Sequence, residues 1–132
     1  MPVSAAELQS DDAAQAFLAE RHLASLTSIK MNGDLHVVPV AFVWVNEEHT
    51  IRIVTRAHSV KVKNADAGSP GVLSFVDRGR WMSLHGTLTV RREPDRIQDT
   101  LDRYAARNGP ARETDAERVS LELIVDFARG RW

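Results

Sequence analysis

The chain has 132 residues, a formal net charge of −1 and no cysteine. This length favours one domain with its own core, and the lack of cysteine excludes disulfides, thiolate metal sites and cysteine nucleophiles. The near-neutral charge argues against nucleic acid or an anionic membrane as the partner. The first twenty residues carry acidic side chains and no apolar h-region, and no apolar run approaches a membrane span. We therefore expect a cytoplasmic protein without a signal peptide.

The first elements are a helix and a hairpin. Ser10-Asp11-Asp12 is a favourable helix start, and the apolar stripe that follows predicts a helix ending near Arg21. Residues 23–31 and 35–45 are predicted strands, and the Asn32-Gly33 pair between them is a strong hairpin signal because both residues tolerate positive φ.

The middle of the chain alternates strands with one short helix. A strand is predicted at 49–55, a helix at 59–67 and a fourth strand at 72–76. Residues 81–91 alternate cleanly, with Met82 and the apolar positions on one face, and Gly86 interrupts that face as a bend or bulge would.

The last elements are a helix and a strand. Pro94 is a good first helical residue, and the stripe Ile97-Leu101-Tyr104 at helical spacing predicts core packing. Residues 109–117 are expected to be a loop, and 119–127 alternate as the last strand.

Six strands, mostly antiparallel, with short helices outside them predict a mainly β fold with flanking helices, in the form of a small barrel. We expect residues 1–132 to form a single domain, with flexible tails at 1–9 and 129–132.

Pro39 lies near the middle of the most apolar predicted strand. Because proline donates no ladder hydrogen bond, one side of this strand should not face another strand. Two interpretations remain open: a plain edge or barrel split, or a flat ligand lying against the backbone of residues 38–41.

The segment from Thr55 to Asn64 places two hydroxyls, an arginine and two lysines where a strand gives way to a helix. A helix start has unpaired N–H groups, so added hydroxyls and a lysine would make a site for one phosphate group. The alternative is that Ser59 is only an N-cap and that Lys61 and Lys63 are solvated.

Other chemistries have weaker support. The five histidines show no metal-ligand spacing, so no metal site is expected. Ser59 beside His58 could suggest a hydrolase, but adjacent residues rarely face each other and no nucleophile elbow is present.

Three groups of residues, taken in order, resemble the pyridoxamine 5′-phosphate oxidase-like split β-barrel family. They are the run 22–27 with the hairpin and His36-Val37-Val38-Pro39-Val40, the segment Thr55-x-x-x-Ser59-x-Lys61-x-x-Asn64, and the strand Arg80-Trp81-Met82-Ser83-Leu84-x-Gly86. The resemblance covers about residues 10–128. It is strongest to the branch that uses the deazaflavin coenzyme F420, and within it to F420-dependent biliverdin reductases.

The resemblance implies a six-stranded antiparallel split barrel that forms an obligate homodimer, with two cofactor sites at the subunit interface. Ser59 and Lys61 would hold the cofactor phosphate. The other implied cofactor contacts are the backbone of Val38, Pro39, Val40 and Ala41, the nearby Thr55 and Asn64, and Trp81 and Met82 as walls that either chain could supply.

A charge argument favours F420 over FMN. FMN ends in a nearly dianionic phosphate monoester, which relatives surround with several cations, whereas F420 has a singly charged phosphodiester at that place. Residues 36–45 contain no lysine or arginine, so we expect few cations around the phosphate. Arg56, Lys63 or Arg78 could then meet the oligoglutamate tail of F420.

The implied reaction is hydride transfer from reduced F420 to a planar conjugated molecule, most simply biliverdin giving bilirubin, with no catalytic side chain assigned. The candidate cations for the two propionates are Arg78, Arg80, Arg129 and Arg131. Two alternatives remain: an FMN-dependent oxidase of the pyridoxamine-phosphate type, and a non-catalytic module that binds a flavin, a deazaflavin or haem.

Overall fold

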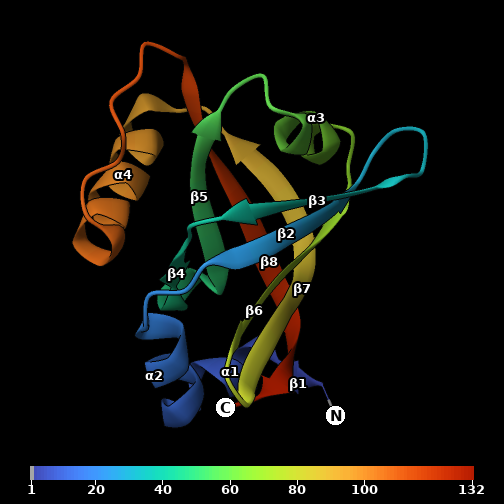
Figure 1. The fold of residues 1–132 in the computed structure, drawn as a ribbon, viewed down its shortest axis with the longest axis vertical. Coiled ribbons are helices and arrows are strands. Elements are labelled where there is room, and N and C mark those ends of the chain that lie inside the picture. The colour runs from blue at the N-terminus through green and yellow to red at the C-terminus, as the bar shows by residue number, and fades with distance from the viewer. Residues whose placement is uncertain (1) are drawn as a thin grey trace.

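Eight antiparallel strands form one sheet in the computed structural model, which describes residues 2–132 (Figure 1). Along the sheet the order is β3-β2-β6-β7-β8-β5-β4, and β1 pairs with β8. The strands are β1 (Val3–Ser4), β2 (Ala24–Ile29), β3 (Leu35–Val40), β4 (Val43–Val45), β5 (Thr50–Arg56), β6 (Pro70–Asp77), β7 (Arg80–Arg91) and β8 (Arg118–Arg131).

The prediction of six strands was wrong in two places. The apolar run 35–45 divides into β3 and β4, because Val40 pairs with β2 at one edge of the sheet and Val43 pairs with β5 at the other edge. Phe42, fully buried, fills the core where the chain crosses between the edges. The short β1 was not expected. Since the two edges of the sheet are joined by only two residues, the sheet curls on itself and stays open between them (Figure 1).

Pro39 lies on β3, at the edge of the sheet, as its missing N–H required. It is opposite Ser25 of β2, and no strand of residues 2–132 pairs with its other side. The prediction that one side of this strand faces no other strand is confirmed.

Helices lie outside the sheet. They are α1 (Ala5–Gln9), α2 (Asp12–Ala19), α3 (Val60–Asp66) and α4 (Pro94–Asn108), with a 3-10 turn at Asn46–Glu48. Asp11 caps α2, because its carboxylate accepts a hydrogen bond of 3.0 Å from the Ala14 N–H. No helix in the described part of the chain is long and apolar enough to cross a membrane.

Both expected tails lie in regular structure where they are described. Residues 3–9 form β1 and α1, and β8 continues to Arg131. The Trp132 indole N–H donates to the Asp11 carboxylate at 3.0 Å, which lowers the pKa of Asp11 together with the larger effect of the Ala14 N–H. Residue 1 lies outside the described residues.

α4 is held against the sheet mainly by ion pairs. Its stripe Ile97-Leu101-Tyr104 is only half-buried, so the prediction of core packing was wrong, and Thr100 is its one buried residue. Beneath the helix the Arg52 side chain, 2% exposed, reaches Asp99 at 2.5 Å and Glu48 at 2.9 Å.

Gly86 is at a bulge, as predicted: the pairing of β7 with β8 shifts between His85 and Gly86. A Cβ added to Gly86 would lie 1.8 Å from the Ile124 carbonyl oxygen.

We predict that Gly86→Ala lowers the free energy of unfolding by about 3 kcal/mol, because the rigid backbone of β8 must move. Denaturant unfolding measures this. Gly79→Ala is the control, because its added Cβ meets nothing within 4 Å. Equal effects of the two substitutions would contradict the steric explanation.

Candidate functional site

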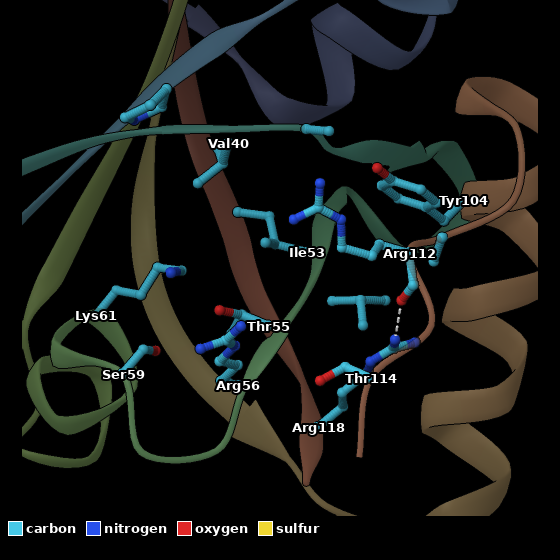
Figure 2. A pocket seen from close by; sticks show the side chains of 14 residues that line it. Val40, Ile53, Thr55, Arg56, Ser59, Lys61, Tyr104, Arg112, Thr114 and Arg118 are labelled. Atoms are coloured by element: carbon cyan, nitrogen blue, oxygen red, sulfur yellow. Dashed lines mark hydrogen bonds between the residues drawn. The ribbon is translucent and has the colours of Figure 1, made fainter. Parts of the chain in front are cut away.

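A cleft of about 380 Å³ opens where the sheet is split, between the end of β3 and the end of β5 (Figure 2). α3 borders it on one side, and α4 with the loop that follows it borders the other side. It is lined by Pro39, Val40, Ala41, Ile53, Val54, Thr55, Arg56, Ser59, Lys61, Tyr104, Ala111, Arg112, Thr114 and Arg118. Its lining therefore combines apolar side chains with polar and positively charged ones.

The structure brings together seven of the eleven predicted cofactor residues in this cleft. They are Pro39, Val40, Ala41, Thr55, Arg56, Ser59 and Lys61. The first three belong to the crossing from β3 to β4, and the other four belong to the turn from β5 into α3. Two segments far apart in the sequence meet because the sheet is open at this point.

Ser59 is the N-cap residue of α3, but its side chain makes no capping hydrogen bond. The hydroxyl oxygen is buried and has no hydrogen-bond partner within the described residues. A buried hydroxyl without a partner is costly, and it is usually found where a ligand or water completes the site. Of the two interpretations of Ser59, the structure therefore favours the binding role.

Lys61 extends from α3 into the cleft and is half-buried (Figure 2). No carboxylate of the described residues lies within 4.0 Å of its ammonium group. Burial lowers the pKa of Lys61 below its ordinary value. An anion bound in the cleft would supply the missing counter-charge.

The sequence did not identify the far wall of the cleft. Tyr104 comes from α4, and Arg112 and Thr114 come from the loop 109–117, to which the sequence pattern assigns no binding residue. Arg118 begins β8 and lies directly opposite Arg56 of β5. The Arg118 guanidinium donates a hydrogen bond to the Arg112 carbonyl (Figure 2).

Four cations line the cleft and no carboxylate does: Arg56, Lys61, Arg112 and Arg118. This overturns the premise that cations around the site are few, which rested on their absence from residues 36–45. The cleft is suited to an anionic ligand, and its charge alone does not distinguish a phosphodiester from a phosphate monoester.

Four predicted cofactor residues do not line this cleft. The Asn64 amide is buried and donates to the Ser28 hydroxyl at 2.9 Å, so it joins α3 to β2. Met82 is 0% exposed in the core, so it does not line the cleft. Val38 packs against the core from the neighbouring position on β3. Trp81 is partly exposed and pairs with Arg131 near the other end of the sheet.

The predicted substrate arginines also lie away from the cleft. Arg78 lies in the turn between β6 and β7 with a positive φ of 58°. Arg80 forms ion pairs with Glu20 at 3.0 Å and Asp77 at 2.6 Å. Arg129 and Arg131 are near the far end of β8, and roughly 36–43 Å of strand separates them from Arg118. Within one chain, these four arginines and the cleft are at opposite ends of the sheet.

Comparison with known proteins gives consistent results. The family model described as "Pyridoxamine 5′-phosphate oxidase" matches residues 10–130. The chain is 40% identical over 121 residues to the F420H(2)-dependent biliverdin reductase of Mycobacterium tuberculosis (strain CDC 1551 / Oshkosh). The matched region covers 92% of this chain and 87% of that protein.

Solved structures share the fold at low sequence identity. An F420 reductase matches with a TM-score of 0.70 at 19% identity, over 87% of this chain and 94% of that chain. HupZ of Group A Streptococcus matches with a TM-score of 0.66 at 15% identity, over 83% of this chain and 84% of that chain.

The unpaired ammonium group of Lys61 leads to a stability prediction. Lys61→Met should raise the melting temperature of the ligand-free protein at pH 7 by about 2 °C, because it removes a desolvated charge and keeps the apolar stem. Differential scanning calorimetry measures this. Lys63→Met, on the exposed side of α3, is the matched control and should change little.

The difference in melting temperature between wild type and Lys61→Met should depend on pH. Because burial lowers the pKa of Lys61 in the folded state from 10.5, the unfolded chain binds this proton more tightly. The gain in stability from Lys61→Met is therefore complete below the lowered pKa of Lys61. It disappears as the pH rises past 10.5, the ordinary pKa of lysine. A gain that persisted unchanged above that value would contradict the charge explanation.

Proposed function

This chain belongs to the pyridoxamine 5′-phosphate oxidase family, and on that premise we propose that it is an F420-dependent reductase whose cofactor binds in the cleft at the split of the sheet. The observation that carries the proposal is a pair of groups: the buried Ser59 hydroxyl and the half-buried Lys61, which have no hydrogen-bond partner and no nearby carboxylate, respectively, among the described residues. The 40% identity to a curated F420H(2)-dependent biliverdin reductase supports F420 as the cofactor.

Each wall of the cleft has a role in this proposal. Ser59 donates its hydroxyl hydrogen to a phosphate oxygen, and Lys61 supplies the counter-charge, with Thr55 and Arg56 beside them. The unpaired edge of β3 at Pro39, Val40 and Ala41 offers a flat surface for the ring or for its ribityl arm.

Reduced F420, when bound, supplies a hydride from C5 of its ring. The protein contributes orientation and a dry surface, since the floor of the cleft is made by apolar side chains such as Val40 and Ile53. We propose biliverdin as the hydride acceptor, reduced at its central methine bridge to bilirubin, with the accompanying proton taken from solvent.

We further propose that the protein is a homodimer. The outward face of β3 exposes Leu35 at 69% and Val37 at 58%, and Ile29 lies opposite Leu35 on β2. An apolar edge strand of this kind favours pairing with a second copy of the chain. Because Pro39 continues this face and also lines the cleft, a partner there would cover the open side of the cleft.

FMN is the second candidate cofactor, and the observation that favours it is the number of cations. Three arginines and one lysine line the cleft, which would suit a phosphate monoester as well as a phosphodiester. The measured affinities of the protein for FMN and for F420 distinguish the two candidate cofactors.

Fluorescence titration of the purified protein with F420 and with FMN tests the cofactor. We expect F420 to bind, and biliverdin to be reduced when it is added to the complex with reduced F420. Lys61→Ala should weaken F420 binding by about 1.5–3 kcal/mol, because it removes a charged hydrogen bond. Micromolar FMN binding without F420 binding would overturn the proposal in favour of the second candidate.

Ser59→Ala is a sharper test of the phosphate site. Its F420 affinity should fall about tenfold, while its stability should stay nearly unchanged because the hydroxyl makes no cap bond. Asp11→Ala is the matched control: it removes a true N-cap, so stability should fall by about 1 kcal/mol while affinity stays the same. Loss of stability in Ser59→Ala with unchanged affinity would show that Ser59 is an N-cap only.

The dimer is tested by sedimentation velocity. Wild-type protein should sediment as a dimer, and Val37→Asp should sediment as a monomer because it places a charge in the apolar face. Ala16→Asp, on the exposed side of α2, is the control and should stay dimeric. A wild-type monomer at micromolar concentration would contradict the proposal.

A further inference from the structure

We infer that Arg107, in the last turn of α4, is a positioning residue for the cleft, because it fixes the crossing from β3 to β4 through the Phe42 ring. The inference rests on the proposed function, in which this crossing offers the flat surface for the cofactor ring. Arg107 does not itself line the cleft, so it acts only through its neighbours.

The crossing between the two edges of the sheet has no strand pairing of its own. β3 ends one residue before Ala41 and β4 begins one residue after Phe42, so neither residue is paired in a ladder. Ala41 lines the cleft, while the Phe42 side chain is fully buried in the core. The position of the Ala41 backbone therefore depends on how firmly Phe42 is held.

Phe42 is held by an aromatic ring and by the end of α4. Its ring stacks on Phe75 of β6, with the ring centroids 5.4 Å apart. The Arg107 guanidinium lies 4.6 Å from the centroid of the Phe42 ring, where a cation–π contact is favourable. The side-chain amide of Asn108, the next residue of α4, donates to the Phe42 carbonyl at 3.5 Å. The end of α4 therefore contacts both the ring and the backbone of Phe42.

The Arg107 guanidinium is itself fixed by a second helix. It donates to the Leu18 carbonyl near the end of α2 and to the carbonyl of Glu20, the C-cap residue of that helix. Carbonyls at the end of a helix have no partner within the helix, and an arginine side chain can satisfy them. Because these bonds lie in the plane of the guanidinium, its flat face remains available for the Phe42 ring.

Folding alone does not explain an arginine at this position. Burial lowers the pKa of Arg107, and among the described residues no carboxylate lies within 4.0 Å of its guanidinium. Its Nε is buried and has no hydrogen-bond partner in residues 2–132. A desolvated charge without a counter-ion is destabilising, and an apolar side chain would fill this space without that cost. What the position does use is the planar fork, which reaches two carbonyls and one ring at once.

Arg107 also connects two walls of the cleft. Tyr104 lines the cleft from α4 (Figure 2), and it is a neighbour of Arg107 on the helix surface because three residues separate them. Anchoring the last turn of α4 on α2 places Tyr104, and contact with Phe42 places the crossing. Arg107 therefore sets the spacing between the crossing and α4.

The experiment measures the affinity of Arg107 variants for two ligands by fluorescence titration, at a temperature where every variant is folded. The ligands are F420 and its fragment that keeps the ring and the ribityl arm but lacks the phosphate and the glutamates. Arg107→Met keeps the apolar stem and Arg107→Lys also keeps the charge, but neither keeps the planar fork. Asp11→Ala is the matched control, because it weakens the opposite end of α2. Lys61→Ala is the control for the phosphate site.

Both Arg107 variants should lose about fivefold in affinity for F420 and for the fragment alike, because the surface for the ring moves while the phosphate site stays. Lys61→Ala should lose affinity for F420 only. Unchanged affinity for the fragment in Arg107→Met would show a purely structural role and overturn the inference. A loss confined to F420, an equal loss in Asp11→Ala or wild-type affinity in Arg107→Lys would overturn it as well.

Amide hydrogen exchange of the ligand-free protein separates this inference from the proposed function. The amides of residues 41–43 should exchange about tenfold faster in Arg107→Lys than in wild type, while those of β7 stay unchanged. If wild-type protein binds neither ligand, the cofactor proposal fails and this measurement still tests the crossing, where exchange at the wild-type rate overturns the inference. Asn108→Ala, which removes the bond to the Phe42 carbonyl, is the milder second variant should Arg107→Lys not fold, and the same two outcomes apply to it.

Discussion

The buried ion network around Arg52 is the interaction on which the far wall of the cleft depends. Arg52 and Glu122 are each 2% exposed, and Arg96 joins Glu122 at 2.5 Å to Glu48 at 2.9 Å. The network raises the pKa of Arg96 far above its ordinary value, with Glu122 as the largest cause and Glu48 as the second. Removing one member would leave a buried charge without compensation, which is strongly destabilising.

This network matters because α4 has little else to hold it in place. Only Thr100 of the helix is fully buried, and it too belongs to the polar cluster, since its hydroxyl lies 3.3 Å from the Arg52 guanidinium. Near the end of the helix the Arg107 guanidinium lies 4.6 Å above the Phe42 ring and donates to the Leu18 carbonyl. The position of Tyr104 and of the loop with Arg112 therefore follows from polar contacts, which are directional, more than from apolar burial.

Local patterns predicted the elements but not the contacts between distant ones. Alternation, the Asn32-Gly33 turn and the Gly86 bulge depend on residues close in sequence, and these predictions are confirmed. The break at residues 41–42 was missed because both strands that it separates are apolar. The alternation of β7 already placed Met82 with the core residues, so its assignment to a cofactor wall conflicted with the pattern itself.

Some residues of the candidate site follow from a local sequence pattern, and others depend on contacts between distant elements. Ser59 and Lys61 are adjacent in sequence to the end of a strand, and a short motif could identify them. Arg112 and Arg118 lie in and after a loop without periodicity, and the juxtaposition of Arg118 with Arg56 exists only through the pairing of β5 with β8. Such a pair cannot be seen before the strand order is known.

The unsatisfied groups of the cleft share one physical property: each is costly in the ligand-free chain and would be satisfied by an anion. The Ser59 hydroxyl lacks a partner among the described residues, and Lys61 is desolvated. Natural proteins accept such costs at sites where binding requires them. Because a ligand that binds only the folded state stabilises it by mass action, binding of an anionic cofactor would offset this loss of stability. The same groups therefore couple the stability of the fold to occupation of the cleft.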